Sequence, residues 1–161
     1  MKKIIFIVIA FFQIVSAADG NKGNSTPVQL ALFTPIQVFA EHTSIEGVRL
    51  NLIYGRNTTL TGFDFGFVNH LTSGHSKGIQ FGFVGIIEED FTGWMDNSVN
   101  YVKGRVEGLQ FGFFNYGGEV SGIQIGIVNY AERMHGLQIG FINVINKNGA
   151  FPIFPIINWS F

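Results

Sequence analysis

The chain has 161 residues, enough for one domain with a buried core but too few for two independent globular domains. Only 13% of the residues are charged, whereas Phe occurs 18 times and Gly 21 times, a composition unlike that of disordered chains and unusually apolar for a soluble domain. The absence of cysteine excludes both disulfides and an acylated N-terminal cysteine.

The first residues predict a signal peptide over 1–18. Lys2 and Lys3 form a positive start, residues 4–15 are apolar, and a small-residue site precedes cleavage after Ala18. The alternative is a membrane anchor, but this apolar run falls short of the ~20 residues that a spanning helix needs. Cleavage leaves a single β-repeat domain over 19–161 with 8 basic and 11 acidic residues, a net charge of −3 that argues against a nucleic-acid partner.

After two expected short strands, Val28–Phe33 and Ile36–Ala40, the chain becomes repetitive. The repeat is Gly-Φ-Gln-Φ-Gly-Φ-Φ-Asn, where Φ is a large apolar residue. Five clear copies begin at residues 62, 78, 108, 122 and 136, and weaker copies begin at 47 and 93. A last copy without the glycine covers 151–158. The leading glycines are 14 to 16 residues apart, and such a fixed period is typical of a repeat architecture.

Within each copy the apolar positions alternate with Gln and Gly, which predicts strands. Leu109, Phe111 and Phe113 are expected on one face of the strand, with Gln110 and Gly112 on the other. Short polar segments between copies, at 117–119, 131–133 and 146–148, indicate turns. No segment after the signal predicts a helix.

Two folds hide the edges of such strands, a closed barrel and a solenoid. Nine-residue strands at ~3.3 Å per residue and ~40° tilt span roughly 23 Å, close to the ~25 Å apolar band of an outer-membrane barrel. Tyr101, Tyr116 and Tyr130 would lie near the membrane interface, and the C-terminal Phe161 is similar to a barrel assembly signal, given a bulge near Asn158.

The solenoid is favoured by the even spacing, and by Gln and Asn at fixed positions, which form side-chain ladders in stacked strands. The copy at Gly93 fits neither fold well, because Asp96 and Ser98 take positions that are apolar elsewhere. We predict the antiparallel outer-membrane-type β-barrel, with the β-solenoid as the alternative.

The tandem copies, the segment 27–37 and the closing residues 154–161 resemble a family of bacterial surface-repeat proteins from two-membrane bacteria. The resemblance covers nearly the whole mature chain and implies a location at the cell envelope. The family has no assigned activity, so no site residue is carried over. Some members are described as lipoproteins, and the lack of cysteine departs from that.

Few residues are candidates for chemistry. The histidines are in or beside expected connections at unlike spacings, typical of solvated loops rather than of a metal site: His42, His70, His75 and His135. The carboxylates of Glu88, Glu89 and Asp90 are the kind of ligand that Ca²⁺ prefers, but without an Asp-x-Asp-x-Asp-Gly pattern they indicate a solvated acidic loop.

Three further features have a structural and a functional interpretation. Asp64 and Arg49 occupy the Gln position of neighbouring copies, which indicates an internal ion pair or, less simply, a proton or ion path. The central glycine of each copy indicates close strand packing or room for a ligand. Asn57 begins a glycosylation sequon, a weak motif. No catalytic, cofactor-binding or metal-binding residue is assigned.

The sequence therefore predicts an exported, non-enzymatic envelope protein, a small barrel of about eight to ten strands in the bacterial outer membrane with a structural or surface-interaction role. Its expected partners are outer-membrane lipid and, through Phe161, the outer-membrane assembly machinery, with no nucleic acid and no cofactor. The alternative is a periplasmic or surface β-solenoid that binds a protein or polysaccharide along a ladder face.

Overall fold

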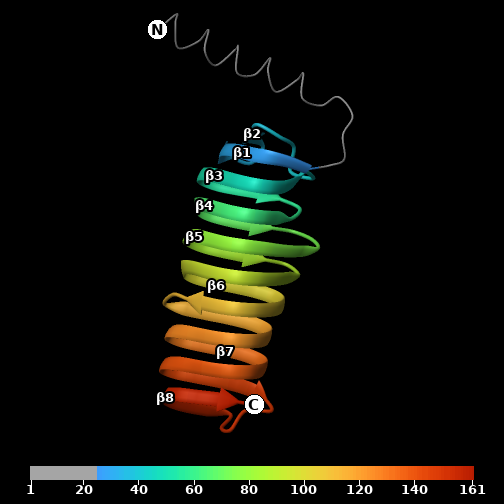
Figure 1. Cartoon of the computed structure of the whole chain (residues 1–161). Helices are drawn as coiled ribbons and strands as arrows, with labels where there is room; N and C mark the ends of the chain where they lie inside the picture. The colour runs from blue at the N-terminus through green and yellow to red at the C-terminus, as the bar shows by residue number, and fades with distance from the viewer. Residues whose placement is uncertain (1–24) are drawn as a thin grey trace, which may run out of the picture.

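A computed structural model describes residues 25–161, so the predicted signal peptide over 1–18 lies outside the described residues. These residues form a β-solenoid, a rod of stacked coils with one terminus of the described chain at each end (Figure 1). Between residues 25 and 161 there is no helix long and apolar enough to cross a membrane. The eight strands are β1 Ser25–Phe33, β2 Ile36–Gln37, β3 Ser44–Asn57, β4 Leu60–Leu71, β5 His75–Ile87, β6 Asp90–Phe111, β7 Phe114–Lys147 and β8 Ile153–Ser160.

Successive coils pair in parallel, one repeat apart, through β1, β3, β4, β5, β6 and β7. Gly62 pairs with Gly78, Gly78 with Gly93, and Gly108 with Gly122, so equivalent repeat positions stack on one another. The predicted antiparallel barrel is therefore wrong, and the alternative β-solenoid is confirmed. A barrel reverses direction at every strand, whereas a constant period returns each coil to the same side in the same direction.

Both ends of the rod are closed by antiparallel strands. At the N-terminal end β2 pairs with β1 and is only two residues long, shorter than the strand expected over 36–40. At the C-terminal end β8 pairs with β7, with an irregular register opposite Phe154 and Ile156. Pro155 and the positive φ of Ile156, 68°, interrupt the outer edge of β8, a common protection against edge-to-edge pairing.

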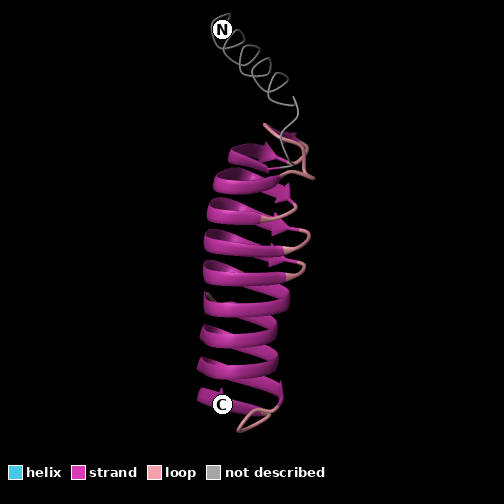
Figure 2. Cartoon of the chain, turned by 45° about the vertical axis from the view of Figure 1, so that its right-hand side comes forward, coloured by secondary structure: helices cyan, strands magenta, loops and turns pink. Residues whose placement is uncertain are grey.

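The apolar core is built from the segments between repeat copies. Two columns of buried apolar side chains run along the rod, one two residues before six of the seven leading glycines and one nine residues after five of them: Ile45, Leu60, Phe91, Val106, Val120, Met134, and Leu71, Ile87, Val102, Ala131, Ile145. The turns expected at 117–119 and 131–133 are wrong, because both segments continue β7 as extended chain. Tight loops join the earlier coils on one side of the rod, and a further loop joins β7 to β8 at the C-terminal end (Figure 2).

The other half of the interior is polar. Gln124 donates to Gln110 at 2.7 Å, and Gln138 donates to Gln124 at 2.8 Å, all three side chains being fully buried. A parallel ladder of Asn100, Asn115, Asn129 and Asn143 has 2.8 Å between each Nδ2 and the next Oδ1. These ladders satisfy amides that would otherwise be costly to bury, and they fix the register between coils.

The leading glycines permit the close stacking. Those of all seven copies have φ between 133° and 156°. A Cβ added to Gly122 would lie 2.0 Å from the carbonyl oxygen of Gly108, so a side chain would separate the coils. The central glycines are as tightly packed, because a Cβ on Gly126 would lie 2.2 Å from the oxygen of Gly112. Close packing, the simpler interpretation of the central glycine, is confirmed.

Candidate functional site

The outer side of the repeat copies is almost entirely apolar. The second, fourth, sixth and seventh positions of each copy point outward, opposite the inward Gln and Asn. In the seven copies that begin with glycine, every one of these positions holds a large apolar residue except Asp96 and Ser98. Phe113 is 64% exposed and Phe141 78% exposed. Contiguous exposed apolar surface of this kind marks an interaction site.

Two rows of these side chains run along the rod. The fourth-position rib consists of Leu50, Phe65, Phe81, Phe111, Ile125 and Ile139, and the sixth-position rib consists of Phe67, Phe83, Phe113, Ile127 and Phe141. Rings on neighbouring coils contact each other, and those of Phe67 and Phe83 stack with centroids 5.0 Å apart. The expected alternation of inward Gln110 and outward Phe111 is confirmed.

A groove of about 530 Å³ lies between the two ribs over the C-terminal coils. The central glycines Gly112, Gly126 and Gly140 line it together with the ribs. Asp96 and Ser98 line it from the neighbouring coil on the N-terminal side, and Ile156 of β8 lines it at the other end. The groove is therefore apolar along its length and carries one carboxylate, at one end.

Amphipathic aromatic side chains flank the apolar outer side. Tyr101, Tyr116 and Tyr130 follow the inward Asn of three successive coils and stack at 4.7 and 5.2 Å. A hydrogen bond from the Tyr130 hydroxyl to Glu132 raises the pKa of Tyr130, and burial raises the pKa of Tyr116. On the other flank, Trp94 occupies the second position and Trp159 pairs with a second-position residue, both about 40% exposed.

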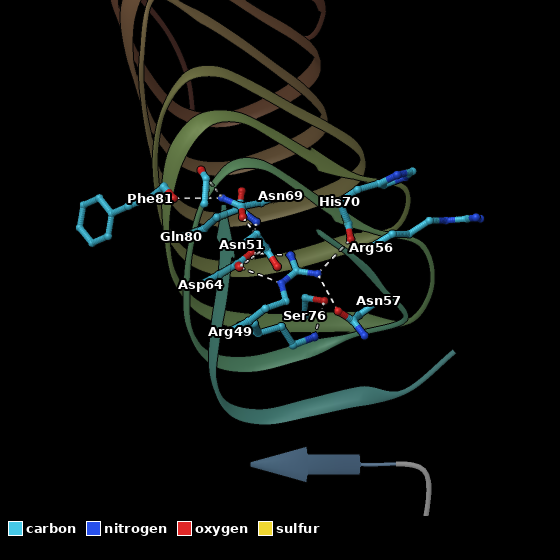
Figure 3. Close-up of polar contacts among 12 residues, drawn as sticks. Arg49, Asn51, Arg56, Asn57, Asp64, Asn69, His70, Ser76, Gln80 and Phe81 are labelled. Atoms are coloured by element: carbon cyan, nitrogen blue, oxygen red, sulfur yellow. Dashed lines mark hydrogen bonds and ion pairs between the residues drawn. The ribbon is translucent and has the colours of Figure 1, made fainter. Parts of the chain in front are cut away.

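A buried ion pair replaces the Gln ladder in the first coils (Figure 3). Arg49 donates to both carboxylate oxygens of Asp64, at 2.8 and 2.7 Å, and neither side chain is exposed. Asp64 also accepts from Gln80 at 2.8 Å, while Arg49 donates to Asn57 and to the carbonyl oxygen of His70. The structural ion pair expected at these positions is present, inside a solenoid rather than a barrel.

Three of the four histidines, His70, His75 and His135, have different partners. His70 is half-buried, with Nδ1 2.7 Å from the Tyr54 hydroxyl and Nε2 3.2 Å from Glu88. Burial lowers the pKa of His70, against the opposing effect of Glu88. His75 contacts Thr92, and the ring of His135 packs edge-on against Phe161. In the part of the chain that the structure describes, no three His, Cys, Asp or Glu side chains form a group suited to a metal ion.

The acidic segment and the sequon have structural roles. Glu88 contacts His70, Glu89 accepts from the backbone of Gly74 at 2.8 Å, and Asp90 accepts from the backbone of Arg105 at 2.7 Å. The three carboxylates therefore have three different partners. Asn57 is fully buried and bonded to the backbone of the loop before β3, so in the folded chain it is closed to glycosylation.

Comparison of the chain with protein-family models, curated proteins and solved structures found no match. The geometry of the outer side is therefore the basis for a functional proposal. Sequence reasoning missed the groove, because its walls come from three coils and its polar end from a fourth. The available signal was the replacement of apolar residues by Asp96 and Ser98 in one copy.

Proposed function

We propose that this chain is an exported, non-enzymatic β-solenoid of the cell envelope, which lies with its apolar outer side against a lipid surface. The observation that carries the proposal is the run of outward apolar residues, interrupted only at Asp96 and Ser98 in seven copies. Side chains such as Phe141, 78% exposed, gain about 1.5–3 kcal/mol each when fully removed from water. Because the coils stack into a rod, many such side chains can contact the same lipid surface.

The flanking residues support a lipid partner. Tyr and Trp are enriched where hydrocarbon meets water, because their rings are apolar and their hydroxyl or indole N–H is polar. The stacked tyrosines lie along one margin of the apolar outer side and Trp94 lies at the other. The charged residues Arg105, Glu119 and Arg133 lie instead in the segments between copies, where they form ion pairs with one another. The chain without residues 1–18 has 8 basic and 11 acidic residues, so no excess of cations attracts it to anionic lipid, and binding is apolar in origin.

The predicted alternative partners are a protein or a polysaccharide, and of these the polysaccharide is less well supported than lipid. Sugars stack on the faces of aromatic rings, and in two ring pairs of this chain a neighbouring ring already covers those faces. Phe67 stacks on Phe83 with 5° between the ring planes, and Tyr116 stacks on Tyr130 with 6°. These four rings therefore present mainly edges to the surroundings. Recognition of Phe161, which is 86% exposed, by an assembly machinery stays a prediction.

Vesicle flotation tests the proposal. We expect the chain without residues 1–18 to float with neutral phosphatidylcholine vesicles, equally at low and high salt. The triple variant Phe67→Ser, Phe113→Ser, Phe141→Ser should lower the vesicle partition constant at least tenfold, since about 1.4 kcal/mol suffices for that change. The control, Lys103→Ser with Arg133→Ser, should bind as the parent does.

Two results would contradict the lipid proposal. One is a parent chain that stays in the aqueous phase with every vesicle composition. The other is a stable dimer in analytical ultracentrifugation that the triple Phe variant dissociates, because the apolar outer side would then be a self-association surface. In cells, fractionation should place the protein with the outer membrane, released by detergent and not by salt.

A further inference from the structure

The groove between the two ribs differs from the rest of the apolar outer side in its single charged end. Its walls are Phe111, Ile125 and Ile139 on one side and Phe113, Ile127 and Phe141 on the other. A volume of about 530 Å³ lies within the range of small-molecule sites, about 300–1,000 Å³. Such sites are mostly apolar with a few polar groups that orient the ligand, which is the composition found here.

We propose that this groove binds one linear alkyl chain of an amphiphile whose cationic or hydroxyl-bearing head lies at Asp96 and Ser98. The proposal deepens the proposed function, on which it rests for the presence of lipid at this side of the rod. It names a particular site and a particular part of the lipid molecule, and it excludes amphiphiles with an anionic head.

The length of the groove matches an alkyl chain. It runs from the coil of Asp96 across the coils of Gly112, Gly126 and Gly140 to Ile156. Coils that pair as neighbouring strands are about 4.8 Å apart, so this path is about 14–19 Å long. One leaflet of a bilayer has a hydrocarbon depth of about 15 Å, half of the ~30 Å core.

Beyond its polar end, the groove offers the backbone of a peptide no hydrogen bonds. It runs across the coils, and the backbone N–H and C=O groups of stacked coils point along the rod toward their neighbours, as in the bond from the N–H of Ile127 to the oxygen of Phe113 at 3.0 Å. An extended peptide laid in the groove would bury its own polar backbone without partners, at a cost of several kcal/mol. An alkyl chain has no polar group to satisfy, so the walls favour it.

The polar end selects the head group. Asp96 and Ser98 stand where the coils on either side carry Phe in both ribs. Asp96 is partly exposed, and no cationic side chain lines the groove. A carboxylate there attracts an ammonium or accepts a hydroxyl hydrogen bond, and it repels a carboxylate, sulfate or phosphate head. The hydrocarbon tail then points toward Ile156.

Calorimetric titration of the folded chain with dodecyltrimethylammonium, below its micelle concentration, tests the proposal. We expect one molecule to bind per chain, about tenfold more tightly than dodecyl sulfate, and tetramethylammonium alone not to bind. Phe113→Ala should weaken binding about tenfold, whereas Phe67→Ala, at the same repeat position outside the groove, should not. Asp96→Asn should abolish the preference for the cation.

Several results would overturn the proposal. They are no saturable binding of the ammonium amphiphile, equal or tighter binding of the sulfate, equal losses in the Phe67 and Phe113 variants, or stoichiometry above one. Circular dichroism of each variant shows that it is folded, and both altered Phe side chains are exposed in the parent. Vesicle flotation separates the two proposals. If the chain floats with vesicles but does not bind the monomeric amphiphile, only the groove proposal is rejected. If it does neither, the proposed lipid partner is rejected as well.

Discussion

Replacing Asp64 by Gln removes the anion that balances the buried Arg49 guanidinium. In the native fold Arg49 makes two bonds to that carboxylate, at 2.8 and 2.7 Å, and neither side chain reaches solvent. Breaking such a pair from one side costs about 3–5 kcal/mol, because a charge stays buried without its partner. We expect Asp64→Gln and Arg49→Gln each to lower the free energy of unfolding by about that amount.

The double variant should recover most of the loss. With Gln at both positions, the interior would continue the ladder seen at Gln110, Gln124 and Gln138, where neighbouring amides are 2.7 and 2.8 Å apart. No charge is then buried, and replacing a buried pair by neutral residues of similar volume is often nearly neutral. We expect the double variant to lie within about 1.5 kcal/mol of the parent.

Denaturant titration followed by far-UV circular dichroism measures these differences, and hydrogen exchange locates them. Exchange should increase in β3 and β4 in the single variants, because each coil of a solenoid depends mainly on its neighbours. Fluorescence is a poorer probe, since the two tryptophans, Trp94 and Trp159, lie in other coils. A double variant as unstable as the sum of the two single variants would refute this reasoning.

Three further predictions concern other parts of the interior. Gly126→Ala should lower stability by about 1–3 kcal/mol, because its Cβ would lie 2.2 Å from a backbone oxygen, and Ser121→Ala, an exposed change nearby, should leave the melting temperature unchanged. Asn129→Leu should cost about 1–3 kcal/mol for each ladder neighbour left unpaired, measured by denaturant titration. The pKa of His70 is lower in the folded chain than its ordinary value of about 6.5. As the pH drops through that value, the unfolded chain takes up a proton more readily than the folded chain, so stability should fall. His70→Gln should flatten the profile of melting temperature against pH.

The placement of the repeat side chains could be predicted because it depends on local geometry. In any extended chain residues two apart share a face, so Gln110 and Phe111 had to point to opposite sides. The sequence also indicated the ion pair between Arg49 and Asp64, because both occupy the Gln position of adjacent copies. The sequence indicated solvated loops rather than a metal site for the candidate histidines and the acidic segment. In the structure, Glu88, Glu89 and Asp90 each contact a different residue.

The apolar core could not be predicted, because its buried residues lie in and beside segments rich in polar residues. The segments 117–119 and 131–133 contain Gly, Glu and Arg, and they indicated turns. In the fold, the inward positions in and beside these segments, such as Ala131 and Val120, pack against their equivalents in neighbouring coils. Their contribution depends on stacking at a distance of one whole repeat, which no local pattern reveals.

The sequence by itself determined that this chain is all-β, that it repeats about every 15 residues, and that Gln and the central Gly face away from the large apolar residues. Only the tertiary structure decided that the coils pair in parallel as a solenoid rather than antiparallel as a barrel. Alternation with period two over the first six positions of a copy is the same in both folds, so it fixes which of those side chains share a face and leaves open how the strands connect. The structure alone showed that positions six and seven both point outward and that the Asn after them points inward. That connection places Phe111, Ile125 and Ile139 in one row, and with them the groove.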